Sequence, residues 1–131
     1  MDTDFEKLLQ IARDNIAHNP DLEKKTTEGK ANQYIQGLLE EIDEVSAEIK
    51  PNNAIFLTDE LSDIAWDYAC VLASLESGGY IESAETVLRH GLEKYTERAP
   101  AFLDSSQDNW NTVKANQKDA LKKSHLNKYG N

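Results

Sequence analysis

Apolar residues recur at every third or fourth position along most of the chain, and this spacing is the feature that most limits its fold. Such spacing puts the apolar side chains on one face of a helix, and no stretch alternates as a strand does. It predicts helices over about residues 3–18, 29–49, 55–77 and 82–98, and a last helix holding Trp110, Val113 and Leu121. The breaks carry helix-ending residues: Asn19-Pro20, Pro51-Asn52-Asn53, Gly78-Gly79, Pro100 and a polar loop at 104–108. Helices with single apolar stripes and short connections predict an all-α, antiparallel helical bundle of four to five helices.

The composition bounds the chain to one domain and a few kinds of partner. A chain of 131 residues suits a single domain over 1–131, with the polar end from about residue 120 expected to fray. No apolar run reaches the roughly 18 residues of a membrane span, and the acidic start shows no secretory signal. A single cysteine, Cys70, fits a reducing, cytoplasmic setting. The net charge of −10 disfavours nucleic acid and anionic membranes, but a polyanionic small molecule bridged by divalent cations is compatible with it.

Two acidic pairs stand on neighbouring predicted helices. Glu41 and Glu44 are three residues apart, so they share a helix face. Glu60 and Asp63 have the same spacing on the next helix. On a helical wheel with about 100° per residue, both pairs flank the apolar stripe of their helix instead of lying opposite it. Measured from the turn near residue 52, the two pairs lie at matching heights of about 12 to 16 Å along the helix axes. Two antiparallel helices are therefore expected to turn all four carboxylates toward one cleft.

Converging carboxylates repel one another, so they need a cation or raised pKa values. Carboxylate oxygens suit hard cations such as Mg²⁺, with Mn²⁺ as a possible substitute, and Mg²⁺ prefers to share its ligands with substrate phosphates. That combination indicates phosphoryl chemistry, in which a metal orients a water for in-line attack. Glu41 and Glu44 are both candidates for a general base, and the sequence does not separate them. The competing interpretation is a solvated acidic face on a non-catalytic acidic helical protein that binds a partner.

A glycine and an aspartate lie next to the acidic pairs. Gly37 falls on the acidic flank of its helix, level with Asp67 on the next helix. A glycine there is expected to leave room for a ligand, although it weakens the helix by about 1 kcal/mol relative to alanine. Asp67 extends the face of Glu60 and Asp63 by one turn, which makes it a candidate for contact with substrate or with the metal through a water.

The same segment resembles the MazG-like nucleotide pyrophosphohydrolases. Their pattern is E-E-x-x-E, a spacer, then E-x-x-D, and it reads here Glu40-Glu41-Ile42-Asp43-Glu44 and Glu60-Leu61-Ser62-Asp63. Downstream, residues 94–102 resemble the K-x-x-R-R-H-P-x-V-F segment of many members, and residues 110–114 resemble their W-x-x-I-K. Glu97 and Ala99 depart from that segment, which concerns the phosphate contacts more than the metal site. The likeness covers about residues 30–118.

The resemblance implies Mg²⁺-dependent hydrolysis of a nucleoside triphosphate, or its deoxy form, to the monophosphate and pyrophosphate. It implies that the ion is held by Glu41, Glu44, Glu60 and Asp63. It also implies a house-cleaning role in the nucleotide pool and a MazG-like bundle completed by oligomerisation as a homodimer or homotetramer. A different nucleotide, such as phosphoribosyl-ATP or dUTP, is the alternative substrate for the same fold.

Basic residues near the downstream motifs are candidates for phosphate contact. Lys94 and Arg98 are four residues apart, so they share a helix face and are placed to meet a triphosphate. Lys114 is a further candidate, and pairing with surface acids is the alternative role for these cations. Trp66 and Trp110 offer faces on which a base can stack, although large aromatic residues more often pack in a core or an interface.

Overall fold

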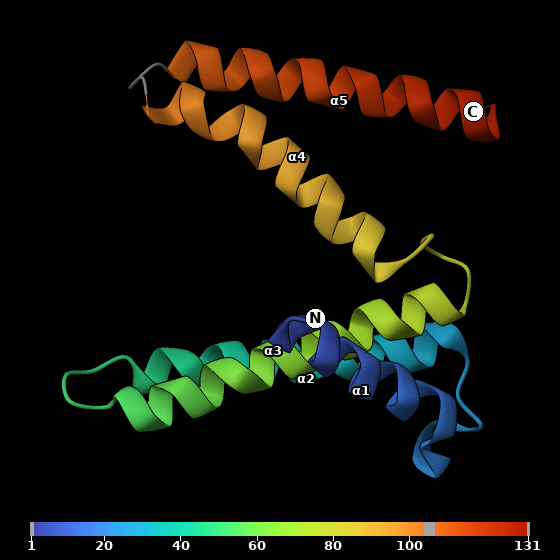
Figure 1. The fold of residues 1–131 in the computed structure, drawn as a ribbon, viewed down its shortest axis with the longest axis vertical. Helices are drawn as coiled ribbons and strands as arrows, with labels where there is room; N and C mark the ends of the chain where they lie inside the picture. Colours follow the sequence, from blue (N-terminus) through green and yellow to red (C-terminus); the bar gives the residue numbers. More distant parts are fainter. Residues whose placement is uncertain (1, 104–106, 131) are drawn as a thin grey trace. The chain divides into compact units, whose positions relative to one another are not determined.

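The computed structural model describes residues 2–103 and 107–130. Over these residues the chain forms five α-helices and one short 3₁₀ turn (Figure 1): α1 (Asp4–His18), η1 (Pro20–Leu22), α2 (Thr27–Glu48), α3 (Ala54–Ser77), α4 (Ala84–Leu103) and α5 (Gln107–Tyr129). No described residue lies in a strand, which confirms the predicted all-α class. Within the same residues, no helix is both long and apolar enough to cross a lipid bilayer.

Local hydrogen bonds explain where the first helices begin. Thr3 and Glu6 form a capping box at the start of α1, where the Glu6 N–H donates to Thr3 Oγ1 at 3.1 Å. Thr26 caps α2 in a similar way by accepting a backbone N–H with its hydroxyl. At the start of α3, Asn53 occupies the cap position, but its side chain donates to the backbone oxygen of Glu48 at 2.8 Å. That bond fastens the turn between α2 and α3 instead of capping α3.

The chain divides into two compact units, residues 1–84 and 85–131, and each is described by itself. In the first unit α2 and α3 pack along each other as an antiparallel hairpin, and α1 packs against α3 (Figure 1). The second half of α3 is therefore covered by two helices, and residues 69–74 are all buried. The buried residues of α1 keep the helical spacing that the sequence predicts: Leu9, Ala12 and Ile16. This packing fixes α2 and α3 against each other.

The apolar stripe of α2 is less buried than its pattern predicts. Leu39, Ile42 and Ile49 are each more than half exposed. On α3, Ile55 and Phe56 near the hairpin turn are exposed to a similar degree. The 3.6-residue period of a sequence identifies an apolar face, but it does not say which chain covers that face. The stripe was expected to pack within a bundle, and in the single chain much of it stays open.

The C-terminal helices differ from the sequence expectation. The prediction that Pro100 ends α4 is wrong, because the helix continues to Leu103. Proline removes one hydrogen bond, at the carbonyl four residues earlier, and only three helical residues follow it here. Of the loop expected at 104–108, residues 104–106 lie outside the described residues, and 107 and 108 already belong to α5. The end that was expected to fray is helical as far as Tyr129. The single domain over 1–131 stays a prediction.

Candidate metal centre

The α2–α3 hairpin brings acidic side chains of both helices together. Carboxylate oxygens of Glu41 on α2 and of Glu60 and Asp63 on α3 all lie within 4.8 Å of one another. We call these three half-buried residues the acidic cluster. Oxygens bind Mg²⁺ at roughly 2.1 Å, so two ligands on opposite sides of the ion are about 4.2 Å apart. The acidic cluster therefore approaches the dimensions of one coordination shell and needs small side-chain movements to reach them, while the role of its members as ligands stays a prediction.

Two carboxylates of the acidic cluster carry raised pKa values. Burial, followed by the neighbouring Glu44, raises the pKa of Glu41 to about 7. A hydrogen bond with Glu44 raises the pKa of Glu60, and burial adds to that rise. Each shift has the direction expected when carboxylates crowd together without a compensating cation. The crowding is therefore unfavourable for the charged forms.

The acidic cluster also leaves buried oxygens without partners. Oε2 of Glu41 and Oε2 of Glu60 are both buried, and neither has a hydrogen-bond partner within the described residues. Buried acceptors without partners cost free energy, which is why most native structures supply a donor, a water or an ion. Oxygen-only donors with negative charge are the set that hard divalent cations prefer. The residues present thus fit Mg²⁺ or Mn²⁺.

Glu44, the fourth acid singled out in the sequence, lies beside the acidic cluster and not within it. Its side chain is exposed, and its oxygens are not among those that converge. It nevertheless raises the pKa values of Glu41 and Glu60 through hydrogen bonding and charge, so it lies within contact distance of both. The predicted level match between Glu44 and Glu60 agrees with this contact. An exposed carboxylate at the edge of a metal group is well placed to meet water.

Asp67 lies one turn further along α3, and Gly37 has a different role from the one expected. A side-chain carbon added at Gly37 would stand 2.8 Å from Oδ2 of Asp67. The glycine therefore makes room for the Asp67 carboxylate, which already fills the space that the sequence assigned to a ligand. Asp67 is only 9% exposed. Burial, then the charges of Asp63 and Glu40, raises the pKa of Asp67.

The contact between Gly37 and Asp67 predicts a non-additive pair of stability effects. Gly37→Ala alone is expected to gain nothing, because the steric conflict with Asp67 cancels the helix preference of alanine. In an Asp67→Ala background, the same Gly37→Ala change is expected to raise the free energy of unfolding by about 1 kcal/mol. Urea unfolding of the two single variants and the double variant measures this. Equal effects of Gly37→Ala in both backgrounds would contradict the contact.

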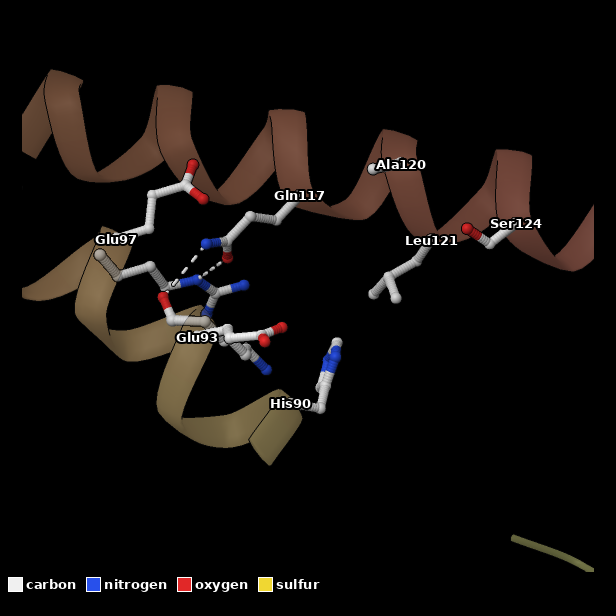
Figure 2. Close-up of a pocket in the computed structure, with 9 residues that line it drawn as sticks. His90, Glu93, Glu97, Gln117, Ala120, Leu121 and Ser124 are labelled. Atoms are coloured by element: carbon white, nitrogen blue, oxygen red, sulfur yellow. Dashed lines mark hydrogen bonds between the residues drawn. The ribbon is translucent and has the colours of Figure 1, made fainter. Parts of the chain in front are cut away.

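The second unit holds the basic residues that the sequence singled out. Lys94 and Arg98 of α4 line a cavity of about 290 Å³ between α4 and α5, together with seven others shown in Figure 2: His90, Glu93, Glu97, Gln117, Ala120, Leu121 and Ser124. The predicted sharing of one face by Lys94 and Arg98 is thus seen. The cavity carries acids as well as cations, since Glu93 and Glu97 also line it.

Arg98 is buried and held in place by α5. Its Nε donates to Oε1 of Gln117 at 2.5 Å, and Gln117 Nε2 donates to the backbone oxygen of Lys94 at 3.1 Å (Figure 2). The guanidinium lies 5.8 Å from the ring centroid of Tyr95 and 5.9 Å from that of Trp110. Nothing in the sequence distinguished Gln117, because its role depends on how α5 packs against α4. These contacts orient the arginine before any ligand binds.

The positions of the remaining candidates, Lys114, Trp66 and Trp110, say less about a role in substrate binding. Lys114 is half-buried on α5 and does not line the cavity of Lys94 and Arg98. Trp66 is half-buried on α3. Trp110 lies near Arg98, so in the structure its ring faces a cation. A base-stacking role for either tryptophan stays a prediction.

Comparison with known protein families identifies the family to which the chain belongs. The family described as MazG nucleotide pyrophosphohydrolase domain matches residues 30–103, which is more than half of the chain. The chain belongs to the MazG family. The matched range includes both acidic pairs, Lys94 and Arg98, and it leaves out α5 with Lys114. Searches of curated proteins and of solved structures found no match. Membership of the MazG family supports a nucleotide pyrophosphohydrolase activity and hence a nucleotide as substrate.

Proposed function

We propose that this MazG-family protein hydrolyses nucleoside triphosphates, ribo- or deoxy-, to the monophosphate and pyrophosphate with Mg²⁺ as cofactor. The observation that carries the proposal is the acidic cluster, whose oxygens converge within 4.8 Å. Two of its buried oxygens have no partner within the described residues, which favours a bound cation over a merely solvated acidic face. A role in removing unwanted nucleotides from the pool follows from the same activity and belongs to the proposal.

Each acid then has a defined task. Glu41, Glu60 and Asp63 would hold the ion, since their oxygens converge between α2 and α3. When bound, the ion would supply positive charge against the phosphates and would lower the pKa of water. Glu44, exposed at the edge of the acidic cluster, orients the attacking water and takes its proton, with Glu41 as the alternative base. As the water oxygen bonds to phosphorus, the bond that links the α- and β-phosphates breaks and pyrophosphate leaves.

A nucleotide panel tests the function directly. Purified protein is assayed for pyrophosphate release from ribo- and deoxynucleoside triphosphates, with dUTP and phosphoribosyl-ATP included, in Mg²⁺ and in EDTA. We expect pyrophosphate to be released in Mg²⁺ and not in EDTA, and one nucleotide to be hydrolysed faster than the others. Absence of release from every nucleotide in Mg²⁺ and in Mn²⁺ would reject the activity and favour the non-catalytic interaction protein.

Lys94 is proposed to contact the phosphates, because it lines an α4–α5 cavity whose neighbouring cation, Arg98, is already oriented. Lys94→Met is expected to raise KM about tenfold with a smaller change in kcat, since a charge-assisted hydrogen bond contributes about 1.5 kcal/mol. Steady-state kinetics with the preferred nucleotide measures the effect. Lys118→Met, an exposed lysine of α5, is the matched control. An unchanged KM in Lys94→Met would remove this residue from the binding site.

We also propose that the chain works as a homodimer or homotetramer. The support is the open apolar stripe of α2 and α3, in which Leu39, Ile42 and Ile55 are exposed. Large apolar side chains left open along a helix face are common where subunits pack together. Light scattering is expected to give two or four times the mass of the chain, and a monomer at micromolar concentration would reject the proposal.

A further inference from the structure

One buried carboxylate, that of Asp67, lies outside the acidic cluster. Asp67 is nine-tenths buried, and it makes no hydrogen bond or ion pair with any residue that the structure describes. An ionised carboxylate only accepts hydrogen bonds, so the group requires a donor to offset its burial. The two charged groups that act on Asp67 are Asp63 and Glu40, and both are acids that offer no hydrogen-bond donor when ionised.

The other polar groups near Asp67, which are Asn15, Tyr34 and Cys70, are hydrogen-bonded among themselves. The charge of Asp67 contributes to the raised pKa values of Tyr34 and Cys70. The amide of Asn15 donates to the Tyr34 hydroxyl at 2.7 Å and approaches Cys70 Sγ at 3.7 Å. Gly37, on the facing helix, contributes backbone alone and lets the carboxylate lie close to α2. None of these groups donates a hydrogen bond to Asp67, and its oxygens are not among the fully buried ones, so they stay open to a donor from solvent or from a ligand.

The position of Asp67 relative to the acidic cluster limits what that donor is. Asp67 follows Asp63 by four residues, so it lies about 6 Å further along the same face of α3. Gly37 precedes Glu41 by the same interval on α2. A nucleotide whose phosphates sit at the acidic cluster presents its sugar next along the molecule and its base beyond. One helical turn matches the step from phosphate to sugar, and a neutral hydroxyl suits a region already crowded with acids.

We infer that Asp67 accepts a hydrogen bond from a hydroxyl of the nucleotide sugar, which makes it a specificity-determining residue; this rests on the proposed function. Because the carboxylate is held between α3 and the backbone at Gly37, it is aimed before the nucleotide arrives. A substrate without the hydroxyl leaves this largely buried carboxylate without its partner, and a site built around a hydrogen bond disfavours such analogues.

The test compares four sugars on the base that the wild-type protein prefers: ribo, 2′-deoxy, 3′-deoxy and 2′,3′-dideoxy triphosphates. Asp67→Ala is expected to lower kcat/KM by about 10- to 100-fold for substrates that carry the hydroxyl that is read, and by less than about threefold for the dideoxy form. The 2′-deoxy and 3′-deoxy substrates identify which hydroxyl it is. Asp67→Asn keeps an acceptor oxygen and is expected to retain most activity.

Two controls separate the alternatives. Asp43→Ala removes an exposed acid of α2 and is expected to leave the sugar preference unchanged. The melting temperature is expected to rise with Mg²⁺, and the Mg²⁺ concentration at half of that rise is expected to be the same in Asp67→Ala and wild type. An equal fall in kcat/KM on all four sugars, or a weakened Mg²⁺ response, overturns the inference while the hydrolase activity stands. Absence of pyrophosphate release by the wild-type protein rejects the proposed function itself, and the inference with it.

Discussion

Glu41→Gln is expected to lower kcat/KM for pyrophosphate release by about 100- to 1,000-fold, because metal-ion stabilisation of the transferring phosphoryl group is worth several kcal/mol. Glu41 is the one member of the acidic cluster that α2 supplies. Glutamine keeps the shape of the side chain and the packing of the hairpin, but it removes the negative charge that we propose holds the cation. The assay is pyrophosphate release from the preferred nucleotide over a range of Mg²⁺ concentrations.

Asp43→Asn is the matched control for that loss. It neutralises an acid of the same helix two residues away, and Asp43 is exposed and outside the acidic cluster. The control is expected to stay within about twofold of wild type, as surface substitutions usually do. If Glu41→Gln retained wild-type activity, or if both variants lost activity equally, the acidic cluster would not be the metal centre.

The sequence carried enough information to find the fold class and the region of the candidate site. Helical spacing on α2 and α3 placed Glu41, Glu60 and Asp63 at matched heights, and the structure brings these three together. The convergence of these three could be predicted because two facts suffice for it: the period of a helix and the length of a short antiparallel turn. The separate position of Glu44 depends on the rotation of α2 about its axis, which a wheel gives only coarsely.

Other features depended on packing that a sequence does not display. The partner of Arg98 is Gln117, and the two are brought together only by the way in which α5 lies along α4. Gly37 was interpreted as space for a ligand, although the side chain of Asp67 takes that space. The continuation of α4 past Pro100 likewise reflects the helix end around it and not the intrinsic preference of proline. The apolar period and the helix propensities of a sequence locate its helices, whereas the contacts between side chains are known only from a structure.

Without metal, the stability of the protein is expected to fall as the pH rises, and Mg²⁺ is expected to reduce that fall. In the folded protein without metal, burial and Glu44 raise the pKa of Glu41 from its ordinary value of 4.5 to about 7. Between these two values the folded state holds more protons than the unfolded state, so the free energy of unfolding falls as the pH rises. Below about pH 4.5 Glu41 is protonated in both states and this penalty vanishes. In EDTA, the melting temperature is therefore expected to drop by several degrees from pH 5 to pH 7.5.

Mg²⁺ binds the charged form of the acidic cluster, so its stabilising effect is expected to grow over the same pH window. Melting curves at pH 5, 6, 7 and 7.5, in EDTA and in millimolar Mg²⁺, measure both slopes. General repulsion at a net charge of −10 also lowers stability at high pH. Asp43→Asn makes the same change in net charge as Glu41→Gln, so it separates the two causes. Only Glu41→Gln is expected to flatten the slope in EDTA and to weaken the response to Mg²⁺. Equal slopes in EDTA and Mg²⁺ for the wild-type protein would mean that the raised pKa of Glu41 is not linked to a bound ion.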